Sequence, residues 1–213
     1  MKTDLSKSWV RRRERDYYYR RARKEQYRSR AVYKLIQAVN RFGFIKEGDV
    51  VVDLGAAPGG WIQASREIVG ERGFVLGLDQ KPIQLIGHSN VCTIVGDVTD
   101  SGIAARINAI LPRKADVVIS DVSPNVSGVW ELDHARQIDL ACHSFDIARC
   151  ILAPNGNFFV KVFQGSMLDN FISEVKKDFS ITRLGKPKAS RSGSAEIYLL
   201  GLGYEGKKLV SKL

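Results

Sequence analysis

A glycine-rich turn directly follows an apolar segment at residues 50–61, which read VVVDLGAAPGGW. Three consecutive valines are typical of a strand buried on both faces, as in parallel sheets. The glycines at positions 55, 59 and 60 let a ligand approach the backbone closely. Because ligands of open α/β sheets bind outside the carboxyl ends of the strands, this turn is the first candidate for a binding site.

The segments around this turn alternate between strand and helix patterns. Helical patterns are predicted near 29–42, 60–69, 101–111, 133–152 and 167–177, with Asp133 as a candidate N-cap. Short apolar strands are predicted near 50–52, 73–78, 91–95, 116–119, 158–160, 180–184 and 195–202. This alternation predicts an α/β fold with a mostly parallel seven-stranded sheet and helices on both faces. Because no helix separates the last two strands, we expect them to pair antiparallel at one edge.

Positive charge is concentrated at the N-terminus. The 213 residues carry a net charge of +10, and residues 1–30 hold 12 Lys and Arg against 4 Asp and Glu. We therefore divide the chain into a basic, aromatic-rich arm (1–28), a nearly neutral globular domain (29–205) and a basic C-terminal tail (206–213). Cations interleaved with tyrosines suit an RNA partner, since they neutralise phosphates and stack on unpaired bases. A solubilising tail is the alternative. Residues 184–194 also predict a mobile basic loop.

The ligand of the turn is not expected to bind through phosphate. A dinucleotide fingerprint would need glycine at Ala57, and a P-loop would need lysine at Trp61. Pro58 removes one backbone N–H donor from the turn. These departures favour a nucleoside-like ligand without a phosphate.

Four carboxylates follow successive predicted strands. They are Asp53, Asp79, Asp97 and Asp121. One such aspartate alone would be read as a turn or cap residue, and Asp53 could still serve mainly to orient the turn. Together they suit a cationic ligand with ribose hydroxyls, and S-adenosylmethionine has this chemistry.

Several motifs resemble those of the FtsJ-type ribose 2′-O-methyltransferases. They are VDLGAAPGGW (52–61), SDVSPN (120–125), VKVF (160–163) and SRAVYKL (29–35). The resemblance runs from about residue 20 to 203 and is closest to the branch that methylates uridine riboses in large-subunit ribosomal RNA. It implies a Rossmann-like S-adenosylmethionine-dependent methyltransferase fold. It also implies a catalytic tetrad of Lys34, Asp121, Lys161 and Glu196, and cofactor contacts at Gly55, Gly59, Trp61, Asp79, Asp97 and Asp121.

Lys161 is the expected general base of this reaction. A ribose hydroxyl is a poor nucleophile, and a buried lysine near other cations loses its proton more readily than an exposed one. Lys34 and Glu196 would orient the reacting groups, although Lys34 could simply extend along an apolar helix face and Glu196 could pair with a surface cation. No metal is expected, because His88, His134 and His143 lack ligand spacing.

The preferred function is methylation of large-subunit ribosomal RNA, either free or in an assembled subunit. The alternatives are a transfer RNA ribose 2′-O-methyltransferase, a non-catalytic RNA-binding assembly factor and a small-molecule methyltransferase. The last is disfavoured by the basic arm. The sequence predicts a cytoplasmic protein without a membrane span. Its N-terminus is charged, it has no long apolar run, and its three cysteines are odd in number and lack C-x-x-C spacing. We expect a monomer.

Overall fold

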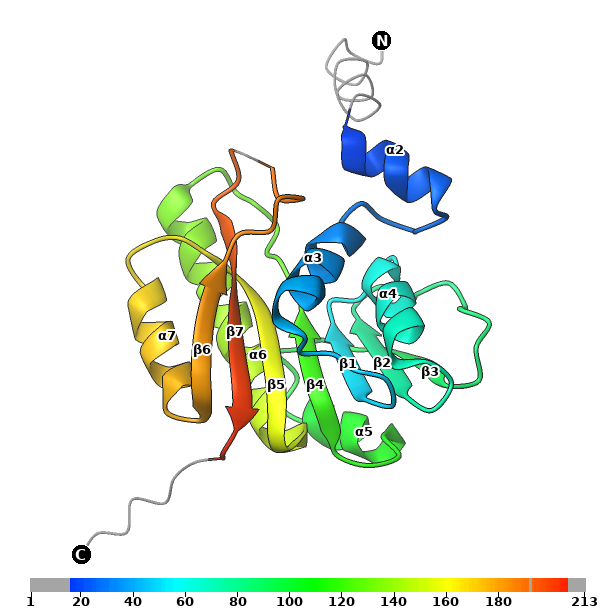
Figure 1. Cartoon of the computed structure of the whole chain (residues 1–213). Helices are drawn as coiled ribbons and strands as arrows, with labels where there is room; N and C mark the ends of the chain where they lie inside the picture. Colours follow the sequence, from blue (N-terminus) through cyan, green and yellow to red (C-terminus); the bar gives the residue numbers. More distant parts are fainter. Residues whose placement is uncertain (1–15, 192, 207–213) are drawn as a thin grey trace, which may run out of the picture.

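A seven-stranded sheet forms the centre of the molecule (Figure 1). The computed structural model describes residues 16–191 and 193–206. The strand order is β3-β2-β1-β4-β5-β7-β6. The strands are β1 (Val50–Leu54), β2 (Phe74–Asp79), β3 (Val91–Val95), β4 (Ala115–Ser120), β5 (Leu152–Phe163), β6 (Phe179–Gly185) and β7 (Glu196–Tyr204).

Six of the seven strands run parallel, as the sequence predicts. Strand β7 is antiparallel to both of its neighbours, β5 and β6. The predicted antiparallel pairing of the last two strands is confirmed. Strand β7 lies one position inside the edge, so β6 becomes the outermost strand. This insertion places Glu196 and Tyr198 beside β5.

Helices cover both faces of the sheet (Figure 1). One face packs against α3 and α4, and the other packs against α5, α6 and α7. Helix α2 lies beyond α3. The helices are α2 (Tyr17–Lys24), α3 (Val32–Phe42), α4 (Gly60–Val69), α5 (Ile103–Ile110), α6 (Trp130–Ile151) and α7 (Leu168–Lys176). None of these described helices is long and apolar enough to cross a bilayer.

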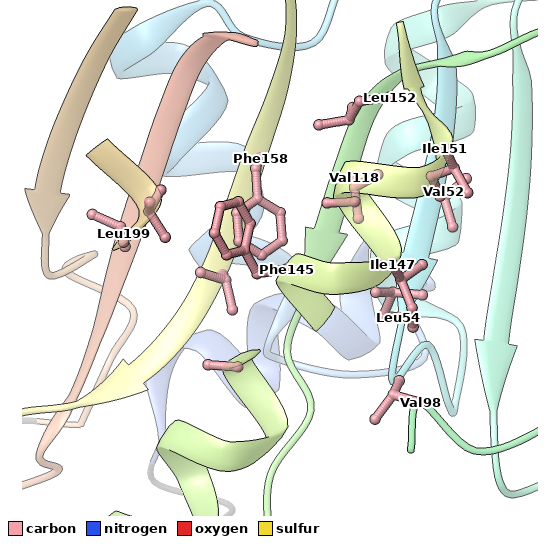
Figure 2. Packing of buried hydrophobic residues seen from close by; sticks show 14 of the residues in the cluster. Val52, Leu54, Val98, Val118, Phe145, Ile147, Ile151, Leu152, Phe158 and Leu199 are labelled. Atoms are coloured by element: carbon pink, nitrogen blue, oxygen red, sulfur yellow. The ribbon is translucent and has the colours of Figure 1, made fainter. Parts of the chain in front are cut away.

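Aromatic stacking joins α6 to the sheet. Figure 2 shows Phe145 of α6 against Phe158 of β5, with ring centroids 5.6 Å apart. Val52, Leu54 and Val118 extend the same buried cluster across β1 and β4. This burial holds the carboxyl ends of β1, β4 and β5 in register, and the candidate site lies at those ends.

The ends of α3 and α6 test two local predictions. Gly43 ends α3 in the left-handed conformation (φ +64), one residue after the helical pattern predicted at 29–42. The prediction of Asp133 as an N-cap is wrong, because α6 begins three residues earlier, at Trp130. The Asp133 carboxylate instead accepts hydrogen bonds from the backbone N–H groups of Ser127 and Gly128, and so holds the preceding loop against the helix.

Part of the predicted arm packs on the domain. Residues 17–24 form α2, whose Ala22 is buried, and Tyr18 lies against Tyr33 of α3 with ring centroids 5.5 Å apart. The hydroxyl of Tyr27 donates to Glu67 of α4. These tyrosines therefore make intramolecular contacts in place of the base stacking that the sequence suggested. The arginine run at 11–13 and tail residues 207–213 lie outside the described residues.

Candidate active site

Three of the four predicted carboxylates line the carboxyl edge of the sheet. Asp79 ends β2, and its carboxylate accepts hydrogen bonds from the backbone N–H groups of Ala57 (2.9 Å) and Lys81 (2.8 Å). Asp97 follows β3 and accepts from the N–H of Thr99, a hydrogen bond that lowers the pKa of its carboxyl. Asp79 thus fixes the glycine turn directly, and Asp97 remains ionised at neutral pH.

Asp53 lies inside the protein. Its side chain is fully buried, and neither carboxylate oxygen has a hydrogen-bond partner. Burial raises the pKa of Asp53 well above its ordinary value, and the charges of Asp121 and Asp79 raise it further. Burial and these neighbouring charges therefore oppose ionisation of Asp53, in contrast to Asp97.

The two predicted glycines serve different purposes. Gly55 (φ +78) lets the chain after β4 come close, since a Cβ there would lie 2.8 Å from Val122 Cγ2. Gly59 (φ +107) caps α4, and a Cβ there would lie 2.9 Å from the guanidinium of Arg28. Gly55 therefore joins the turn to the Asp121 segment, and Gly59 opens the first turn of α4, whose N–H groups lack intrahelical partners.

Arg28 holds the glycine turn from outside it, a role that the sequence does not reveal. Its guanidinium donates to the backbone carbonyls of Pro58 (3.2 Å), Gln84 (2.6 Å) and Leu85 (2.8 Å). These bonds tie the glycine turn to the loop between β2 and β3. The sequence predicts this arginine as part of the RNA-binding arm, and its bonds to three distant backbone groups give it a structural role in the turn.

The Trp61 side chain is part of the core. It is 4% exposed, and its Nε1 donates to the carbonyl of Ala31 at 2.8 Å. Its ring packs near Phe159 and Tyr198. A cofactor contact at Trp61 would therefore come from its backbone N–H in the first turn of α4.

The four predicted tetrad residues form two lysine–carboxylate pairs. Lys161 Nζ lies 3.3 Å from Asp121 Oδ1 and donates to the Asp121 backbone carbonyl at 2.8 Å. Lys34 Nζ lies 2.8 Å from Glu196 Oε2. Lys161 is 5% exposed and the Asp121 side chain 19%, so the lysine of the first pair is buried and its carboxylate is partly exposed. All four side chains lie on the α3 side of the sheet's carboxyl edge.

Tyr198 connects the two pairs, and sequence reasoning missed it. Its hydroxyl donates to Asp121 Oδ1 at 2.7 Å, and its ring lies 5.8 Å from Lys34 Nζ. Burial alone would raise the pKa of Asp121, but the charges of Lys161 and Lys34 and the Tyr198 bond outweigh it, so that this pKa is lowered. The signal was present, because Tyr198 is two positions from Glu196 and shares its strand face.

Gln137 of α6 was also missed. It is 1% exposed, and its Nε2 donates to the carbonyls of Val122 (3.1 Å) and Lys161 (3.0 Å). The amide bridges the segments that carry Asp121 and Lys161, and so fixes their separation. Among the described residues, no group of three His, Cys, Asp or Glu could hold a metal ion.

Comparison with known proteins agrees with this geometry. The FtsJ-like methyltransferase family matches residues 27–204. The chain belongs to the FtsJ-like methyltransferase family. The match includes the glycine turn, both lysine–carboxylate pairs and Arg28, and it begins after α2.

Close relatives of this FtsJ-like chain carry one name. Ribosomal RNA large subunit methyltransferase E of Methanocaldococcus jannaschii is 49% identical over 205 residues, which cover 95% of this chain and 84% of the relative. The protein of that name from Methanothermobacter thermautotrophicus is 46% identical, and the matched residues cover 96% of this chain and 97% of the relative.

Solved structures share the fold. A protein from Plasmodium falciparum described as a ribosomal RNA methyltransferase superposes with a TM-score of 0.75 at 28% identity, covering 85% of this chain and all of that one. Fibrillarin of Aeropyrum pernix, solved with S-adenosylmethionine, matches with a TM-score of 0.57 at 15% identity over 83% of this chain and 75% of its own, a likeness of fold alone.

Proposed function

We propose that the protein transfers a methyl group from S-adenosylmethionine to a ribose 2′-hydroxyl of large-subunit ribosomal RNA. The observation that carries this proposal is the junction of two lysine–carboxylate pairs through Tyr198, beside the glycine turn. The related methyltransferases E supply the substrate class.

The carboxylate set fits S-adenosylmethionine. In this proposal Asp79 would accept bonds from the ribose hydroxyls, Asp97 would accept from the adenine amino group, and Asp121 would accept from the methionine ammonium. Pro58, without an N–H, suits a turn that binds a nucleoside and no phosphate. When bound, the cofactor supplies a methyl group on a positively charged sulfur, which makes its carbon electrophilic.

Lys161 is placed to take the proton of the 2′-hydroxyl. As a base, the amine of Lys161 would take the proton, and the two Asp121 oxygens beside Nζ would stabilise the ammonium that forms. The Lys34–Glu196 pair, fixed beside Tyr198, would hold the ribose in line with the methyl group, and such orientation supplies much of the acceleration.

RNA is the partner in this proposal, and α2 carries exposed cations that suit it. Arg20, Arg21, Arg23 and Lys24 of α2 are exposed to solvent. We further propose a cytoplasmic, monomeric enzyme. Light scattering of the purified protein tests the last point, because a mass near 23.7 kDa is expected.

Mapping of transferred label tests the proposed function. The protein is incubated with S-adenosylmethionine labelled in the methyl group and total RNA from cells that lack it. The expected result is label at one 2′-O-methylated nucleotide of large-subunit ribosomal RNA. Label in transfer RNA would contradict the substrate, label on a base would contradict the reaction, and RNA binding without label would indicate an assembly factor.

A further inference from the structure

A pocket of about 410 Å³ lies between α3 and the outer strands β7 and β6. Its walls are the last turns of α3 on one side and Gly185 with residues 186–188 on the other. Its floor is formed by Phe159, Tyr198 and Leu200. The roles assigned above to the turn and the tetrad do not use this space.

The strand register places the pocket next to the catalytic lysine. Tyr198 pairs with Lys161 on β5 and with Gly185 on β6. Residues paired across a sheet lie on the same face. One tyrosine therefore borders the catalytic lysine on one side and the pocket on the other.

Aromatic rings line the pocket. Phe159 and Tyr198, 2% and 1% exposed, form its apolar floor, and the half-buried ring of Phe42 offers a surface for stacking. Gly185 leaves the space open, because a Cβ there would lie 3.9 Å from the ring of Phe42 and meet nothing closer. Unpaired bases bind to proteins by stacking on such rings.

Cations surround these rings. Arg41, Arg183, Lys186 and Lys188 line the pocket, and no Asp or Glu does. Among the described residues, no carboxylate forms an ion pair with Arg41, Arg183 or Lys188. The guanidinium of Arg41 lies over the Phe42 ring at 4.9 Å. This charge is complementary to a phosphate backbone.

The outer wall is fixed to α3. We expected residues 184–194 to form a mobile loop, but Ala189 in this segment is fully buried. Its N–H donates to Gln37 Oε1 at 3.0 Å, and its carbonyl accepts from Arg30 Nη2 at 2.5 Å. These bonds correct the prediction, since they hold the wall in place before any ligand binds.

We propose that this pocket binds a nucleotide of the substrate RNA that flanks the methylated ribose. Its base stacks on the half-buried ring of Phe42 above the floor of the pocket, and its phosphate contacts Arg183 and Lys188. The inference rests on the proposed function and deepens it by adding an RNA subsite outside the tetrad. It assigns the pocket to binding and alignment of RNA and leaves proton transfer to Lys161.

Two pocket variants separate charge from shape. The double variant Arg183→Gln with Lys188→Gln removes two cations, and Gly185→Leu fills the pocket without changing charge. The matched control is Arg72→Gln with Lys177→Gln. It removes two exposed cations that precede β2 and β6, at the amino ends of these strands. The measurements are kcat, KM for ribosomal RNA at several salt concentrations, and the Kd of S-adenosylmethionine.

Both pocket variants should raise KM for RNA about 10-fold, with kcat and cofactor Kd within about 2-fold of wild type. The charge variant should also have a shallower salt dependence, whereas Gly185→Leu should keep the wild-type slope. The control should match wild type. Pocket variants that behave like the control would overturn the proposal. Normal methylation of isolated RNA with loss only on assembled subunits would also overturn it, because that pattern indicates a protein contact.

Photo-crosslinking provides a second readout. Ribosomal RNA carrying 4-thiouridine beside the target should crosslink to peptides that contain Phe42 or residues 183–188. Crosslinks confined to other parts of the domain would contradict the pocket, even if Gly185→Leu folds poorly. A wild-type protein that methylates no ribosomal RNA would contradict the proposed function itself, whereas unaffected pocket variants of an active enzyme would contradict only the subsite.

Discussion

Asp53 and Asp121 are aspartates of adjacent strand ends with opposite protonation behaviour. Asp121 has two lysine charges and the Tyr198 hydroxyl around it, so its pKa is lowered despite burial. Asp53 has no hydrogen-bond partner, and burial raises its pKa. The sequence predicts both as edge carboxylates, because spacing alone carries no information about which side chain finds a cation.

The raised pKa of Asp53 predicts how stability depends on pH. A carboxyl with a higher pKa in the folded chain binds more protons when folded. Its contribution to the free energy of unfolding is therefore full below the unfolded pKa of about 4 and is lost as the pH rises toward the folded pKa. The Asp53→Asn variant has no titrating group at this position, so it does not lose this stability as the pH rises. Urea unfolding from pH 4 to 7 should show the variant gaining on wild type, by up to about 1.4 kcal/mol for each pH unit over which native Asp53 stays protonated. A constant difference across this range would contradict a raised pKa.

Gln137 tests whether the separation of Asp121 and Lys161 must be fixed. Gln137→Leu removes both bonds of the bridging amide, which leaves two buried carbonyls without this donor and should cost about 1–3 kcal/mol of stability. We expect kcat to fall about 10-fold or more with little change in the KM for RNA, since positioning errors act on the chemical step. Steady-state kinetics of the folded variant at low temperature checks this, and an unchanged kcat would show that the bridge is structural only.

At the scale of elements, the strand order determines which contacts can be predicted from the sequence. The βα alternation and the aspartates at strand ends follow from patterns along the chain, and the structure confirms the sheet that they imply. Tyr198 reaches Asp121 only because β7 inserts between β5 and β6. Gln137 reaches Lys161 from α6, 24 residues away. Such long-range pairings depend on tertiary packing, and local patterns do not specify them.

The junction between the glycine turn and α4 gives a prediction for cofactor binding. Gly59→Ala would place a side chain at φ +107 and close to Arg28, which should cost about 1–3 kcal/mol of stability. It should also weaken S-adenosylmethionine binding about 10-fold or more, equivalent to about 1.4 kcal/mol. Gly43→Ala is the control, because Gly43 also has a positive φ and no atom near its Cβ position. Calorimetric titration that finds equal cofactor affinity in both variants would argue against a role of the Gly59 turn in binding.

At the scale of the molecule, the boundary between arm and domain differs from a division by charge. The sequence divides the chain at residue 28 because charge and aromatics are dense before it. Burial of Ala22, the Tyr27–Glu67 bond and the Arg28 bonds all cross that line. Composition does not distinguish an arginine that binds RNA from one that binds backbone carbonyls, so only the structure assigns Arg28.

Removal of residues 1–15 tests the arm without disturbing α2. This segment holds six Lys and Arg and two Asp and Glu. RNA affinity should fall and its salt dependence should become shallower, by a slope of about 0.7 for each lost phosphate contact to single-stranded RNA. Fluorescence anisotropy at several salt concentrations measures both quantities, with the cofactor Kd as the control. Unchanged RNA affinity and slope would reduce the segment to a solubility tail.

The proposed reaction depends most on Lys161 as the base of methyl transfer. The direct test is a single-turnover assay of Lys161→Met with ribosomal RNA and labelled S-adenosylmethionine, alongside calorimetric measurement of cofactor affinity. Loss of a general base should slow methyl transfer about 10²- to 10⁴-fold while the cofactor still binds. Methyl transfer by this variant at the wild-type rate would contradict the account.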